Sequence, residues 1–110
     1  MKRNEGMFVH PVVESKRADL EALCGKFHVR RLELFGSAAK GGFDPARSDL
    51  DFLVEFESLP KGSKARNYFG FARELESLFG RPVDILTRRS IRNRYLLESV
   101  DSTRVLLHAA

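Results

Sequence analysis

The stretch S-D-L-D-F-L-V-E-F, residues 48–56, decides the fold of this chain because polar and apolar side chains alternate along it for the length of a strand. Successive side chains of a strand point to opposite faces of the sheet. One face would carry the apolar residues and the other would carry both aspartates: Leu50, Phe52, Val54 and Phe56 against Asp49, Asp51, Leu53 and Glu55. The stretch therefore predicts a half-buried strand with two carboxylates on its open side.

Hydrophobic periodicity predicts the elements on either side of this strand. Residues 29–35 and 82–87 read as further strands, and residues 104–108 as a short last strand. Helical spacing predicts one helix from Val13 to Phe27, a long one through Tyr68 to Phe79 that Gly80 closes, and a basic helix over 90–99. Residues 1–11 are interpreted as a loose lead-in. The pattern indicates an α/β fold, a small mixed sheet with helices on one face and the carboxylates on the other.

Length and composition limit the classes of protein to which this chain can belong. The 110 residues fit one compact domain, so we expect a single unit over 1–110 without a second substrate domain. The net charge of +4 favours anionic partners but is too small to establish nucleic-acid binding. Cys24 is the single cysteine, which excludes an internal disulfide and indicates a reducing compartment, the cytoplasm. No segment approaches the roughly 18 apolar residues of a membrane span, so a soluble protein is expected.

Three acids are the candidate metal ligands. Asp49 and Asp51 lie two residues apart on the predicted strand, which places their side chains on one face about 7 Å apart. Asp84 stands between apolar Val83 and Ile85, where a charge is costly unless it faces a functional surface. Mg²⁺ prefers carboxylate oxygens and completes its shell with substrate phosphates and water. The acids therefore predict a Mg²⁺ site, with Asp84 able to bind an ion or to orient an acceptor hydroxyl.

A glycine and a serine directly after the first strand are the candidate phosphate-binding residues. Gly36 permits close approach of the backbone, and Ser37 offers a hydroxyl and an N–H at a predicted helix start. The pair precedes the two aspartates by a short, turn-rich stretch. The order of a phosphate turn, an acidic pair and a later single acid is more specific than any of the three parts.

These motifs, G-S-A-A-K-G, S-D-L-D-F-L-V-E-F and V-D-I-L, resemble the MNT group of the polymerase-beta-type nucleotidyltransferases over residues 13–108. The resemblance implies that fold. It further implies that Gly36 and Ser37 hold the triphosphate of an NTP, ATP for preference, and that Asp49, Asp51 and Asp84 hold two Mg²⁺ ions. Lys40 stands where the family often has arginine, and it keeps the charge without the bidentate fork. Lys40 is therefore included among the nucleotide-binding residues.

The same resemblance implies a function as an antitoxin that transfers AMP to a protein hydroxyl on a HEPN RNase toxin, assembled as a homo- or hetero-oligomer. Two alternatives stay open: an antitoxin that neutralises its partner by binding alone, and a nucleotidyltransferase that modifies a small molecule. Outside the site, Phe69, Phe71 and Phe79 are interpreted as core residues, as is Cys24, and no histidine is assigned to a metal. The basic run Arg88, Arg89, Arg92 and Arg94 fits a phosphate contact and a solvated helix face equally well.

Overall fold

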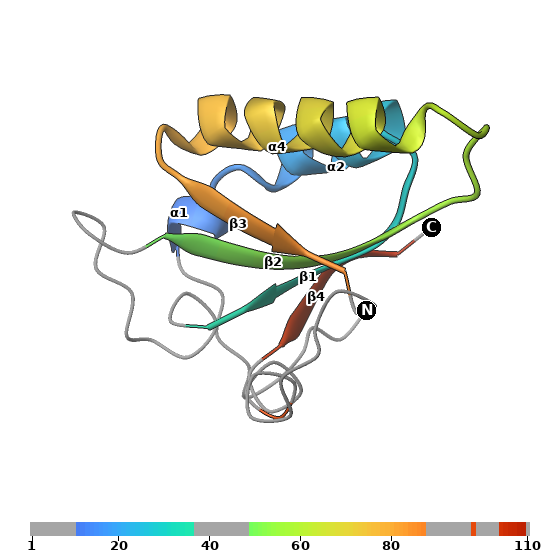
Figure 1. Cartoon of the computed structure of the whole chain (residues 1–110). Helices are drawn as coiled ribbons and strands as arrows, with labels where there is room; N and C mark the ends of the chain where they lie inside the picture. The colour runs from blue at the N-terminus through green and yellow to red at the C-terminus, as the bar shows by residue number, and fades with distance from the viewer. Residues whose placement is uncertain (1–10, 37–48, 88–97, 99–103, 110) are drawn as a thin grey trace.

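A computed structural model of the chain describes residues 11–36, 49–87, 98 and 104–109. Within these ranges the chain forms three helices and four strands (Figure 1). The helices are α1 (Pro11–Glu14), α2 (Arg17–Lys26) and α4 (Lys64–Phe79). The strands are β1 (Val29–Phe35), β2 (Leu50–Phe56), β3 (Val83–Leu86) and β4 (Val105–Ala109).

The four strands form one mixed sheet in the order β3-β2-β1-β4. β1 pairs antiparallel with both β2 and β4, whereas β2 and β3 are parallel. Parallel neighbours need a crossover connection, and α4 supplies it. Gly80 ends α4 in the left-handed conformation, with φ of 63°, and its N–H donates to the Glu76 carbonyl at 2.8 Å.

Helices α2 and α4 lie together on one face of the sheet, above the strands in Figure 1. The main core fills the space between these two layers. It contains the apolar side chains of β1 and β2, which alternate toward the helices as the sequence predicted, together with one side of α4: Leu32, Leu34, Leu50, Phe52, Val54, Phe71, Leu75 and Phe79. Cys24 is also fully buried there. The opposite face of the sheet is therefore the one left for chemistry.

The predicted helix over 13–27 is broken into two. The Ser15 N–H donates to the Pro11 carbonyl and the Lys16 N–H to the Val13 carbonyl, while the Ser15 hydroxyl approaches the Val12 carbonyl at 3.4 Å. A serine side chain that competes for backbone carbonyls favours a helix end, which accounts for the break. Pro11, assigned to the lead-in, instead begins α1.

The prediction that Phe69 is a core residue is wrong. Phe69 is 62% exposed, because it lies on the outer side of α4, where its ring meets the ring of Tyr68 edge-on. Phe71 and Phe79 are buried as predicted. The predicted basic helix over 90–99, apart from the helical residue Glu98, and the turn over 37–48 lie outside the described residues. No helix within those ranges is long and apolar enough to cross a membrane.

Candidate active site

Two of the three predicted acids face each other across neighbouring strands. In the parallel pairing of β2 with β3, Asp51 is the register partner of Asp84. Both side chains lie on the sheet face away from the helices, since the alternate residues Leu50, Phe52 and Ile85 belong to the core. The two carboxyl groups are close enough that Asp84 raises the pKa of Asp51. Two segments more than thirty residues apart in the sequence therefore meet at one carboxyl pair.

The environment of Asp51 disfavours its charged form. Burial, followed by the nearby Asp84 charge, the hydrogen bond to Asp84 and the Asp49 charge, raises the pKa of Asp51 from 3.8 to about 6. Neighbouring apolar side chains bury Asp51. Phe35 is the cross-strand partner of Asp51, and it packs with Leu53 and Leu86 into a small apolar cluster on the open face. A cation beside these carboxyls would relieve both the repulsion and the desolvation.

Asp49 makes a weaker contribution than the other two acids. It is exposed and directly precedes β2, and its charge is the smallest of the causes that raise the pKa of Asp51. Among the described residues, no group of three or more His, Cys, Asp or Glu side chains is arranged to hold a metal ion. The carboxyl pair is thus assembled, whereas the three-acid ligand set stays a prediction.

Gly36 lies directly against the carboxyl pair. Its φ is +75°, a conformation that side-chain-bearing residues rarely adopt, and a Cβ built on it would stand 2.5 Å from Oδ2 of Asp51. Sequence reasoning assigned Gly36 to the phosphate and missed this second role, because a contact between residues 36 and 51 depends on the register of β1 with β2. Ser37 and Lys40 lie outside the described ranges, so their part in the site stays a prediction.

The donor chemistry of the pair fits Mg²⁺. Asp51 and Asp84 supply carboxylate oxygens on an open surface, which suits an ion that takes one or two carboxylates and completes its shell with phosphates and water. Gly36 keeps the space beside Asp51 clear of side-chain atoms. Asp51 and Asp84 would hold the ion, and Asp49 lies close enough to add charge.

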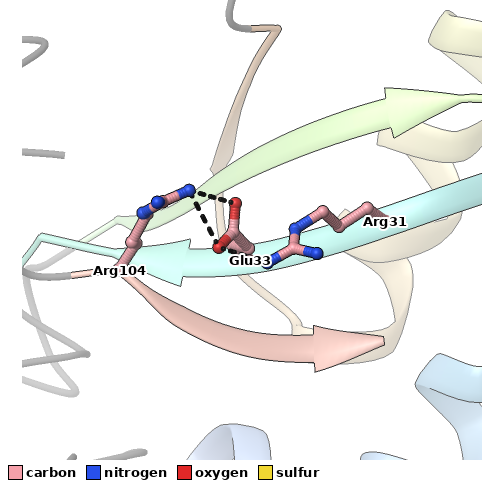
Figure 2. Close-up of polar contacts among 3 residues, drawn as sticks. All are labelled: Arg31, Glu33 and Arg104. Atoms are coloured by element: carbon pink, nitrogen blue, oxygen red, sulfur yellow. Dashed lines mark hydrogen bonds and ion pairs between the residues drawn. The ribbon is translucent and has the colours of Figure 1, made fainter. Parts of the chain in front are cut away.

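A second charged cluster on the open face was not predicted. The carboxylate of Glu33, in β1, is only 6% exposed, yet two arginines contact it (Figure 2). Arg104 donates from Nη1 to both carboxylate oxygens at 3.3 Å, and Arg31 donates from Nη2 at 3.5 Å. Arg104 is far away in the sequence and precedes β4, which explains why no local pattern indicated the cluster.

Comparison with known proteins identifies the family. Residues 17–107 match the model of the nucleotidyltransferase domain. The chain is 34% identical over 92 residues to the putative protein adenylyltransferase MJ1379 of Methanocaldococcus jannaschii, an alignment that covers 82% of this chain and 88% of the relative. The chain therefore belongs to the nucleotidyltransferase domain family, and its enzymatic class is that of a nucleotidyltransferase.

Solved structures support the polymerase-beta-like fold. A putative minimal nucleotidyltransferase is 31% identical, with a TM-score of 0.67 and coverage of 84% of this chain and 90% of that one. A toxin–antitoxin structure with AMP-PNP matches at 22% identity with a TM-score of 0.64, covering 86% and 73%. A tri-AMPylated Shewanella oneidensis HEPN toxin in complex with MNT antitoxin matches at 19% identity with a TM-score of 0.59, covering 88% and 72%. The last two likenesses concern the fold alone.

The raised pKa of Asp51 leads to a stability prediction. Between about pH 4 and 6 the folded protein binds more protons than the unfolded chain, so the contribution of Asp51 destabilises the fold progressively as the pH rises through that window. Allowing for the partial exposure of Asp51, we expect the free energy of unfolding of Asp51→Asn to exceed that of wild type by about 1 to 2 kcal/mol at pH 7.5. Near pH 4 the two free energies should be about equal. Urea denaturation in EDTA at the two pH values measures the difference. A gap of the same size at both would refute the assigned cause.

Proposed function

We propose that this chain is a Mg²⁺-dependent nucleotidyltransferase that moves AMP from ATP to a hydroxyl of a HEPN-type toxin and thereby acts as its antitoxin. The observation that carries the proposal is the Asp51–Asp84 carboxyl pair beside Gly36 on the open face of the sheet. The MJ1379 relative, whose name describes a putative protein adenylyltransferase, supports AMP transfer to protein. The complex of an AMPylated HEPN toxin with an MNT antitoxin supports the class of partner.

The reaction needs positioning more than covalent chemistry from the protein. The acceptor hydroxyl oxygen bonds to the α-phosphorus, the bond from that phosphorus to the β-phosphate oxygen breaks, and pyrophosphate leaves. The hydroxyl proton passes to the Asp84 carboxylate, which the open face exposes to the acceptor. Mg²⁺, when bound, neutralises charge on the phosphates and on the leaving pyrophosphate.

The Gly36 turn would hold the triphosphate at the end of the sheet where β1 ends and β2 begins. Asp51 lies between that turn and Asp84, so its carboxylate would face the reacting phosphate. The open face lets a side chain from another folded protein approach. A protruding tyrosine is the acceptor that best fits this geometry, because its hydroxyl extends far from its own backbone.

Mass spectrometry of the partner tests the proposal. After incubation of both proteins with ATP and Mg²⁺, we expect the HEPN partner to gain the mass of one or more adenylates and to lose its RNase activity. The double variant Asp49→Asn, Asp51→Asn should leave the partner unmodified and active, since it removes the carboxylate charge that would hold Mg²⁺ against the phosphates. A partner that stays unmodified yet is silenced equally by wild type and variant would favour the alternative, an antitoxin that acts by binding alone.

A further inference from the structure

A groove of about 810 Å³ lies beside the carboxyl pair. Its volume is in the range of roughly 300 to 1,000 Å³ that is typical of ligand clefts. Its lining includes Leu53 and a charged cluster of three side chains on the open face of the sheet, Arg31, Glu33 and Arg104. It also includes Thr87, which follows β3, and Tyr68 of α4. None of these residues belongs to the phosphate turn or to the carboxyl pair.

The groove begins one row of side chains away from the acids. On the open face, Asp51 and Asp84 form one row, and Leu53 with Glu33 forms the next, because Glu33 is the register partner of Leu53. Diagonal neighbours in an antiparallel pair are about 7 to 8 Å apart, which is the separation expected between Glu33 and Asp51. The arginines that contact Glu33 are therefore close enough to act on a molecule whose reactive atom is at the acids.

The charged cluster presents positive charge to the groove. Glu33 is buried, whereas the side chains of Arg31 and Arg104 are 43% and 37% exposed. The three side chains carry two positive charges and one negative charge, and the negative one is hidden from solvent. The groove is also lined by Arg30 and Lys64 and by the acids Glu55 and Glu57, so the described lining has four basic and three acidic side chains, a net charge of +1. A guanidinium group is a planar fork that matches a carboxylate. Figure 2 shows the Glu33 carboxylate between the two arginines, where it fixes both of them.

We infer that this groove binds the acceptor-bearing segment of the protein substrate, and that Arg31 and Arg104 recognise an acidic side chain next to the acceptor hydroxyl. This inference rests on the proposed function, since it names the substrate that the same site takes. The phosphates of ATP are the other anion in the reaction. They belong at Gly36, beyond the end of β1, whereas the groove extends in the opposite direction along β2, from Leu53 toward Leu59.

Peptide binding tests the inference without catalysis. The probes are two short fluorescein-labelled peptides with a central tyrosine, one with glutamates on both sides and one with glutamines at the same positions. By fluorescence anisotropy we expect the acidic peptide to bind more tightly, and Arg31→Gln or Arg104→Gln to weaken it about fivefold each. Arg73→Gln, which removes the same charge from the exposed side of α4, should leave the affinity unchanged.

Glu33 is a positioning residue in this scheme, and it allows a control for folding. Arg104→Gln alone leaves a buried carboxylate with one partner fewer, whereas Glu33→Gln with Arg104→Gln removes both charges and keeps the net charge of the protein. The double variant should lose affinity for the acidic peptide as well. Retained affinity would show that net charge, and not the arginine fork, attracts the peptide, and the inference would be wrong.

Further measurements distinguish a failure of the groove assignment from a failure of the proposed function. Equal binding of the two peptides, or no binding, overturns the groove assignment even if the protein labels a HEPN partner from ATP. Weaker ATP binding in the arginine variants, by calorimetry with Mg²⁺, would overturn it by assigning the groove to the nucleotide. Selective binding of the acidic peptide without transfer of AMP to any acceptor would sustain the groove and contradict the proposed function.

Discussion

Asp51→Asn is expected to lower nucleotidyl transfer by about 10² to 10³-fold, the loss that follows removal of one preorganised group that stabilises the reacting charge. Asparagine has the shape of aspartate but neither its charge nor its affinity for a hard cation. The wild-type carboxyl lies between Gly36 and Asp84, so no other described side chain occupies its position. Transfer of labelled AMP from ATP to the HEPN partner, at saturating Mg²⁺, measures the effect.

Asp19→Asn is the matched control, because it makes the same chemical change on the exposed surface of α2, in the helical layer. It should transfer AMP at the wild-type rate. Asp51→Asn is also expected to be more stable than wild type in EDTA, so a loss of activity cannot be attributed to unfolding. Transfer by Asp51→Asn within a few-fold of wild type would remove this residue from the active site.

Gly36→Ala is expected to reduce transfer by about 10²-fold or more, because it displaces the Asp51 carboxylate from the reacting atoms. The new Cβ would stand 2.5 Å from Asp51 Oδ2, and the residue would have to keep a φ of +75°. Either the carboxylate moves or the turn opens. The expected signature is a fall in kcat together with weaker ATP binding, measured by transfer kinetics and calorimetry.

Gly80→Ala separates backbone strain from displacement of the carboxylate. Gly80 has a similar φ of +63°, but a Cβ there would meet no atom within 4 Å. Both alanine variants should lose roughly 1 kcal/mol of folding free energy, and only Gly36→Ala should lose activity. If Gly80→Ala impairs transfer as much as Gly36→Ala, then general destabilisation explains the result and the contact with Asp51 does not matter.

Most of the fold could be predicted from the alternation of polar and apolar residues along the strands. The period of two in residues 29–35 and 50–56 placed β1 and β2 with their correct faces, and an aspartate between two apolar residues placed Asp84 on the open face. The site could be predicted to this extent because a strand has only two faces, and the apolar residues occupy one of them. The identity of Gly80 as the end of α4 followed from the same kind of local rule.

Contacts between distant segments could not be predicted in this way. Ser15 ends α1 through a competition for carbonyls that periodicity does not record. The approach of Gly36 to Asp51 and of Arg104 to Glu33 depends on strand register, which a single sequence does not specify at atomic detail. Phe69 was assigned to the core because aromatic residues are usually buried, but the turn of α4 directs it outward.

The register of β3 has a consequence for folding errors. A slip of one residue against β2 would turn Asp84 toward the apolar layer under α4 and bring Ile85, now buried, into water. Exposing the aliphatic side chain costs about 1.5 to 3 kcal/mol, and burying the carboxylate without a partner costs more. Asp84, which is proposed for chemistry, thus also specifies the strand register, since the sheet is most stable in the alignment that pairs Asp84 with Asp51.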